Sequence, residues 1–188
     1  DDLRDEAVVA ASTTSAFVAR YLDGLDLLAT SLRLHPAVQG LDRAAASDVF
    51  ARMLADNPAL LTVVLVGRDG REVARASNNN EASFEDDDWA AMVITAATRS
   101  VSPLEPGKRG LNSVTIGYPV RNNAGELIAA LGFRIRLQAI QAVFERFPLP
   151  QGSVVTVTDE HGTILARTVN PDQYVGQRTP RSRPLDQI

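Results

Sequence analysis

The sequence contains no cysteine among its 188 residues. Disulfide bonds and thiolate-ligated metals are therefore excluded, but the compartment is not fixed, because many bacterial extracytoplasmic domains also lack cysteine. Histidine is scarce too: His35 precedes a proline and His161 falls in a predicted turn. The chain has no G-x-S-x-G, H-E-x-x-H or phosphate-binding glycine loop, so we expect no enzymatic activity, metal or cofactor.

Charge of one sign and long apolar runs are missing as well. The net charge of −4 is dispersed and forms no basic stripe, so nucleic acid is not an expected partner. No apolar run reaches the roughly 18–20 residues that cross a bilayer. What is present is typical of a globular protein with a packed core, since 45% of residues are hydrophobic and 22% are charged.

Two helices are predicted in the first 57 residues. Residues 3–34 contain no proline, and apolar residues recur there at helical spacing at Phe17, Tyr21, Leu25, Leu28 and Leu32. The small residues of 7–16 suit the close approach of another helix. A second helix is expected over 43–56, with Asp42 as its N-cap.

A hairpin-like stretch occurs twice along the chain, as VVLVGRDGREVARAS at 63–77 and VVTVTDEHGTILARTV at 154–169. Each copy combines an apolar strand, a polar turn ending in glycine and a second strand that closes on Ala-Arg. Glycine favours the positive φ that such turns require. The two copies are either a true repeat of one module or two strand pairs of similar composition.

Further strands follow a helix expected over 84–99. In GELIAALGFRIRL, alternation places Leu131, Phe133 and Ile135 on one face, and Gly132 and Arg134 on the other. With NSVTIGYPVR and a short strand before it, the chain supplies five strands with one helix inserted after the second. We therefore predict an α+β fold, a PAS-like antiparallel five-stranded sheet with the long N-terminal helix packed on it.

The sequence resembles the extracytoplasmic Cache (PDC-type) sensor domains of bacterial transmembrane receptors, especially the double-Cache kind. The resemblance rests on the long N-terminal helix and on three segments in a distinctive order: LLTVVLVGRDGREVARAS, NSVTIGYPVRNNAGELIAALGFRIRL and PLPQGSVVTVTDEHGTILARTVNPDQYVGQ. It implies three parts: two helices in 1–57, a membrane-distal PAS-like module in 58–147, and the start of a membrane-proximal module in 148–188. The tail after the second hairpin has too few apolar residues to complete a sheet.

The resemblance also implies a function. Such domains lie in the periplasm as parts of inner-membrane receptors, bind a small molecule, and signal through the long helix to a kinase, diguanylate cyclase or chemoreceptor output domain. We accordingly expect a homodimer formed through the long helix, in which the stripe at Phe17 and Tyr21 takes part. Contact with the membrane is expected only through transmembrane helices outside this sequence.

The expected ligand site lies on the sheet face that carries Arg134. Family members that bind amino acids hold the ligand's amino group with an acidic residue in the last strand, but this sequence has Arg134 there. The amino-acid pocket is therefore not expected to carry over, and arginine instead favours a carboxylate or another anion. The competing interpretation is that Arg134 pairs with a carboxylate of the protein itself.

Four further residues complete the predicted ligand site. Trp89 either stacks on the ligand or belongs to the core, and Thr115 lies on the strand next to Arg134. Lys108 is either an exposed loop residue or lines the mouth of the pocket. Arg75 matches Arg167 in the second hairpin, which also fits a structural role. The alternative function is a ligand-free dimerisation or spacer module, in which this sheet face would be packed with Leu, Ile and Ala.

Overall fold

The computed structural model describes residues 2–78, 88–105, 112–144, 152, 154–159 and 161–179. The chain divides into two compact units, Ala19–Ala139 and the pair of segments Asp1–Val18 and Ile140–Ile188. The larger unit contains the sheet with the helices that cover it, and the smaller contains the second hairpin. Lys108 and the predicted start of the 84–99 helix fall outside the described residues.

The helices of the first 57 residues agree closely with the sequence. Helix α1 spans Asp2–Leu34, and α3 spans Arg43–Asp56 with the Asp42 carboxylate accepting from the Ala45 amide at 3.1 Å. Between them lies a short helix, α2 (Pro36–Gln39), which we did not predict. His35 caps it: the residue before a proline is pushed out of the helical region, and its Nδ1 accepts from the Ala37 amide at 3.2 Å.

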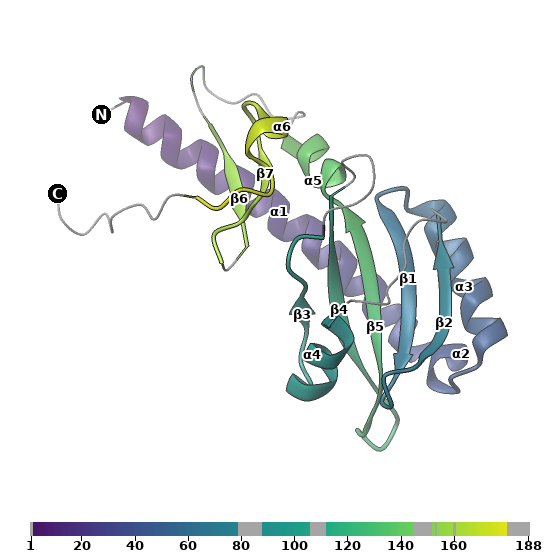
Figure 1. Ribbon diagram of the computed structural model, residues 1–188. Coiled ribbons are helices and arrows are strands. Elements are labelled where there is room, and N and C mark those ends of the chain that lie inside the picture. The colour runs from purple at the N-terminus through teal and green to yellow at the C-terminus, as the bar shows by residue number, and fades with distance from the viewer. Residues whose placement is uncertain are drawn as a thin grey trace. The chain divides into compact units, whose positions relative to one another are not determined.

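Five antiparallel strands form one sheet in the order β2-β1-β5-β4-β3, as Figure 1 shows, which confirms the predicted fold class. Their bounds are β1 Leu60–Gly67, β2 Glu72–Ser77, β3 Ser100–Val101, β4 Ser113–Arg121 and β5 Leu127–Arg136. All eight residues of β1 are buried, which explains why apolar residues occupy both faces of this strand. Gly70, with φ of 78°, makes the turn into β2.

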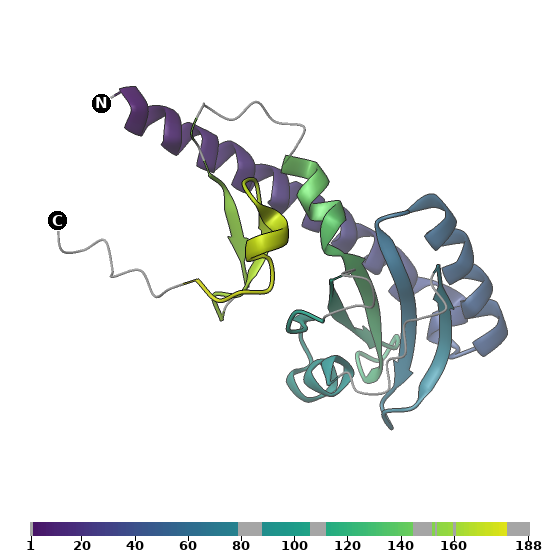
Figure 2. The same ribbon diagram turned by 45° about the horizontal axis from the view of Figure 1, so that its top comes forward.

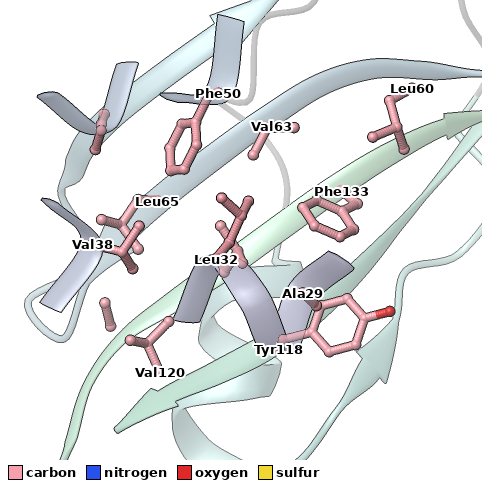
Figure 3. Packing of buried hydrophobic residues seen from close by; sticks show 14 of the residues in the cluster. Ala29, Leu32, Val38, Phe50, Leu60, Val63, Leu65, Tyr118, Val120 and Phe133 are labelled. Atoms are coloured by element: carbon pink, nitrogen blue, oxygen red, sulfur yellow. The ribbon is translucent and has the colours of Figure 1, made fainter. Parts of the chain in front are cut away.

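One face of the sheet, called here the α1 face, packs against helices α1, α2 and α3. Figure 3 shows Ala29 and Leu32 of α1 meeting Tyr118, Phe133 and other sheet residues in this core. The large residues of β5 lie on this face, as alternation predicted. Tyr21 is partly buried and packs against the same core, and the expected dimer contact through Phe17 and Tyr21 stays a prediction. The outward side of α1 carries Leu27 and Leu34, each 72% exposed.

The opposite face, called here the α4 face, carries helix α4 (Trp89–Ala96). Figure 2 shows α4 and α3 on opposite sides of the sheet. The helix ends at Ala96, three residues earlier than predicted, and its C-cap residue Ala97 adopts a left-handed conformation with φ of 53°. The apolar residues beneath it form a second, smaller cluster than that of the α1 face, namely Val64, Val66, Trp89, Ala90, Val93 and Ala130.

The smaller unit contains the second hairpin, formed by β6 (Thr156–Thr158) and β7 (Ile164–Arg167). Helix α5 (Leu137–Phe144) precedes it and helix α6 (Pro171–Tyr174) follows it. Arg167 holds this hairpin together, since its guanidinium lies 4.4 Å from the centre of the Tyr174 ring and donates to Thr156 at 3.1 Å. This accounts for the arginine that closes the second copy of the motif.

Candidate functional site

The buried polar residues of the described chain gather on the α4 face. Four polar residues are classed as buried in that part of the chain: Thr62, Ser102, Ser113 and Thr115. Thr62 alternates along β1 with residues of the α1 core, and Ser113 and Thr115 do so along β4. Because a buried hydroxyl is costly unless it forms hydrogen bonds, such a concentration calls for a reason beyond packing.

Five polar residues lie in a line across the whole sheet, and we call this line the polar row. Thr62 lies opposite Ser77 on one side and Arg134 on the other, and Thr115 lies opposite Arg134. Ser102 completes the line, since its amide donates to the Thr115 carbonyl at 2.8 Å. Thr62 and Ser77 share a hydrogen bond of 3.0 Å between their hydroxyls. The polar row therefore runs Ser77, Thr62, Arg134, Thr115 and Ser102.

Arg134 stands in the middle of the polar row and pairs with an acid of the protein itself. Its Nη2 forms an ion pair with the Glu105 carboxylate, and its Nε donates to the Ser113 hydroxyl at 3.1 Å. The two charged side chains are only 11% and 15% exposed. The structure thus supports the competing interpretation that we gave for Arg134, and the pair as a whole brings no net charge to the site.

Glu105 is the residue that sequence reasoning missed. Its Oε1 accepts from Ser102 at 2.9 Å and from Thr115 at 3.0 Å, while Oε2 faces Arg134. We call Ser102, Thr115 and Arg134 the donor cluster. Glu105 lies in a proline- and glycine-rich segment that reads as a loop. Its paired backbone hydrogen bonds with Ser113, of 2.8 and 3.0 Å, bring it to the sheet edge.

Trp89 borders the polar row and fills the space that we expected to be open. A Cβ atom built on Gly132 would lie 2.6 Å from Cη2 of the Trp89 ring, and one on Gly117 would lie 2.8 Å from its Cε3. The two glycines therefore make room for the indole, which is 2% exposed, rather than for a ligand. This placement agrees with the core interpretation of Trp89, although the ring also forms one side of the site.

Arg75 lies on the α4 face, one row away from Arg134. Its strand partner Val64 is in turn paired with Gly132 of β5. The Arg75 guanidinium forms an ion pair of 2.5 Å with Glu72, and its side chain is 30% exposed. The structure therefore brings Arg134, Thr115, Trp89 and Arg75 to one face of the sheet, as the predicted ligand set requires, and Lys108 stays a prediction.

A separate polar contact ties helix α1 to β4 and to the segment after α4. The Tyr118 hydroxyl donates to Asp26 of α1 at 2.8 Å, and Arg99 donates to both oxygens of the same carboxylate at 3.1 and 2.9 Å. Burial raises the pKa of Tyr118, and the hydrogen bond and negative charge of Asp26 raise that pKa further. The phenol therefore stays neutral, and it serves as a hydrogen-bond donor to the long helix.

The described residues contain no group of three or more His, Asp or Glu side chains placed to hold a metal ion. None of their helices is both long and apolar enough to cross a membrane.

Known sensor domains share this fold at low sequence identity. The ligand-binding domain of the Pseudomonas fluorescens chemoreceptor CtaA, in complex with L-serine, matches with a TM-score of 0.72 and 15% identity over 94% of this chain and 76% of that chain. The sensory domain of the Campylobacter jejuni chemoreceptor Tlp3, with isoleucine bound, matches with a TM-score of 0.66 and 17% identity over 94% of this chain and 73% of that chain. The extracellular domain of mmHK1S-Z2, assigned as a histidine kinase, matches with a TM-score of 0.71 and 15% identity over 94% of this chain and 76% of that chain. No family model and no curated protein sequence matches the chain.

Proposed function

We propose that this chain is the extracytoplasmic ligand-sensing domain of a bacterial transmembrane receptor, of the double-Cache kind. It binds a small molecule at the polar row and passes the signal through α1 to an output domain on the other side of the membrane. The shared fold supports this proposal, because the matched structures are extracellular or ligand-binding domains of chemoreceptors and of an assigned histidine kinase. The two chemoreceptor domains hold an amino acid.

The polar row is the observation that carries the proposal. A sheet that served only to space two helices would gain most from apolar side chains on both faces, since buried polar groups add little net stability. The α4 face instead places Thr62 and Thr115, both without solvent exposure, beside Arg134. Hydroxyl groups and a guanidinium are suited to a small polar ligand that brings its own acceptors.

We propose a ligand that carries a carboxylate, with Arg134 and Thr115 as its principal contacts, Trp89 as one wall, and Lys108 and Arg75 at the periphery. Because Glu105 balances the charge of Arg134, a ligand that also carries an ammonium group fits the site better than a simple anion. The amino acids bound by CtaA and Tlp3 have this combination of charges.

The contact between Asp26, Tyr118 and Arg99 supports transmission through the long helix. Arg99 follows α4, whose Trp89 borders the polar row, and Asp26 lies on α1. A movement of α4 on ligand binding would therefore act on α1 through one carboxylate. A ligand shifts such an equilibrium only by its difference in affinity for the two states, so we expect α4 to sit differently in the two states.

We further propose that α1 forms a homodimer in the receptor, through its outward side. Leu27 and Leu34 are one heptad apart on that side and are largely exposed, and Gly24 and Ser31 are further exposed positions at helical spacing from them. This surface differs from the one through Phe17 and Tyr21 that the sequence predicted.

A thermal-shift screen of amino acids, small carboxylates and amines tests the proposed function. A ligand at 100 times its Kd should raise the free energy of unfolding by about 2.7 kcal/mol. Thr62→Val and Thr115→Val keep the volume of the side chain but remove a hydroxyl from the polar row, so they should abolish the shift. Thr98→Val, at an exposed position, is the matched control and should leave binding unchanged.

The alternative function is a ligand-free spacer and dimerisation module. It is favoured by the Trp89 indole, which fills the space above Gly132, and by Glu105, which already satisfies Arg134. If no compound in the screen shifts the wild-type protein, while the thermal stability of Thr115→Val equals or exceeds that of the wild type, the spacer function is the better account.

A further inference from the structure

The three members of the donor cluster converge on a single carboxylate. Thr115 and Ser102 donate to one oxygen of Glu105, at 3.0 and 2.9 Å, and Arg134 pairs with the other. Two hydroxyls and a guanidinium around one carboxylate make an arrangement that recognises the carboxylate group and not the chain attached to it. Glu105 thus supplies the same chemical group that an organic acid would bring.

The donors are held in place independently of Glu105. Thr115 and Arg134 lie opposite each other on neighbouring strands, so the sheet fixes their spacing. Arg134 is further held by Ser113, to which its Nε donates at 3.1 Å. The Ser102 hydroxyl accepts from the Thr115 amide at 2.9 Å, which orients it toward the site. Departure of Glu105 would therefore leave the donor cluster assembled.

The Glu105 side chain, by contrast, is attached at the edge of the sheet. Its backbone forms two hydrogen bonds with Ser113, and these do not depend on where the carboxylate points. The side chain has rotatable bonds and retains 15% exposure, more than any member of the polar row on β1, β4 or β5. It can leave the donor cluster by rotation alone, without breaking the edge of the sheet.

We propose that the donor cluster is a carboxylate-binding subsite, in which the Glu105 side chain is a tethered occupant that the carboxylate of an incoming small organic acid replaces. The inference rests on the proposed function and adds to it a competition between an internal and an external carboxylate. No covalent bond changes in the exchange: the ligand accepts the hydrogen bonds that Glu105 gives up, and Glu105 turns toward solvent or toward a cationic group on the ligand.

The hydrogen bonds of Ser102 and Thr115 explain why a molecule that replaces Glu105 must supply an acceptor. The Ser102 hydroxyl also lies 2.9 Å from the Pro103 carbonyl, so its single proton has another acceptor when Glu105 leaves. The Thr115 hydroxyl is fully buried, and Glu105 is the one acceptor described for it. A departing Glu105 would leave this donor unsatisfied, which is costly. Only a ligand that supplies an acceptor in the same position can therefore take the place of Glu105.

Removal of the Glu105 carboxylate gives a direct test of the proposal, with acetate as the probe. In Glu105→Ala the donor cluster loses its internal carboxylate, so the unfolding midpoint should fall and then rise saturably with sodium acetate, by about 5–10 °C at 100 times the Kd. Sodium chloride at equal ionic strength should not reproduce the rise. Glu126→Ala, an exposed acid in the β4–β5 turn, is the matched control for general effects of acetate.

The wild-type protein should bind acetate at least about tenfold more weakly than Glu105→Ala, because Glu105 occupies the subsite for most of the time. Equal midpoints of Glu105→Ala in acetate and chloride would overturn the proposal, and so would equal acetate affinities of this variant and the wild type. If Glu105→Ala does not fold in either salt, the side-chain NMR resonance of Arg134 in the wild-type protein tests the subsite. It should shift saturably with acetate, and an unchanged resonance would refute the subsite.

The outcomes separate this inference from the proposed function. Acetate binding by Glu105→Ala, together with a wild-type protein that responds to nothing in the ligand screen, would leave Glu105 as a permanent partner of Arg134 and favour the spacer function. A wild-type protein that binds an amine or a neutral compound, with a Glu105→Ala variant indifferent to acetate, would retain the sensor function and remove the carboxylate subsite.

Discussion

A methyl group added at Gly132 would test whether the contact between Trp89 and the sheet fixes helix α4. The Cβ atom of an alanine there would lie 2.6, 2.8 and 3.0 Å from the ring atoms Cη2, Cζ2 and Cζ3 of Trp89. Carbon atoms in favourable contact are about 3.5–4.0 Å apart. The indole, and α4 with it, must therefore move away from the sheet by roughly 1 Å to accept the variant.

The expected loss of stability follows from two opposing effects. Overpacking of a well-filled contact costs about 1–3 kcal/mol. Replacement of glycine by alanine inside a strand returns about 0.5–1 kcal/mol, because the unfolded chain loses conformational freedom. At the middle of both ranges, Gly132→Ala should lower the free energy of unfolding by about 1.25 kcal/mol and at most by about 2.5 kcal/mol. The middle value corresponds to a fall of about 3–5 °C in Tm for a chain of this length.

The tryptophan itself provides the assay, since Trp89 is the single tryptophan of the sequence. Its emission should shift to longer wavelength in Gly132→Ala as the ring loses contact with the sheet, and denaturant unfolding should give the change in stability. Gly24→Ala is the control. Its Cβ atom would meet nothing within 4 Å in helix α1, so this variant should gain about 0.5–1 kcal/mol.

A second substitution separates the clash from other effects of Gly132→Ala. Trp89→Leu removes the ring atoms that the new methyl group would meet, so the two changes together should destabilise by less than the sum of their separate effects, with a coupling above about 0.5 kcal/mol. A Gly132→Ala protein with wild-type stability and unchanged emission would refute the close contact, and with it the conclusion that the glycines make room for the indole.

Three other predictions concern α1 and its contacts. Arg99→Ala should lower the free energy of unfolding by less than about 1 kcal/mol, because the ion pair between Arg99 and Asp26 is partly exposed. The same substitution should reduce the signalling output of the intact receptor more than it reduces the ligand affinity of the isolated domain. The pKa of Tyr118 lies above its ordinary value of 10.0, so its contribution to stability is complete below about pH 10 and declines above it; Tyr118→Phe should lose less stability than the wild type when denaturant unfolding is compared between about pH 9 and 11. Sedimentation at high concentration should show dimers that Leu27→Glu abolishes, and a wild-type protein that stays monomeric would contradict the dimer through this side of α1.

Much of the fold could be read from local patterns. The long helix, the Asp42 cap, the Gly70 turn and the alternation along β5 are each decided by residues close together in sequence, and the structure confirms them. The strand order was not predicted, because the pairing of β1 with β5 joins segments that lie far apart in the sequence. The short helix α2 was missed, since a four-residue helix leaves no periodic pattern.

The site could be predicted only in part. Alternation was enough to place Arg134 and the small residues on one face, but it could not say what fills the space above Gly132. The sequence around Glu105 gave no indication that this residue belongs to the site, because a single acid between two prolines is typical of a loop. Its position depends on backbone pairing with Ser113, which lies eight positions further along the chain.

The sequence by itself determined the elements of this protein and which side chains share a face, because helical and strand periodicities act over a few residues. Tertiary structure decided the partners. It joined Ser77, Thr62 and Arg134 from separate strands into one row and packed the Trp89 indole against Gly132. It also paired Glu105 with Arg134, for which the sequence had predicted a ligand. Those contacts depend on strand register and on side-chain volume summed over distant segments, which no local pattern encodes.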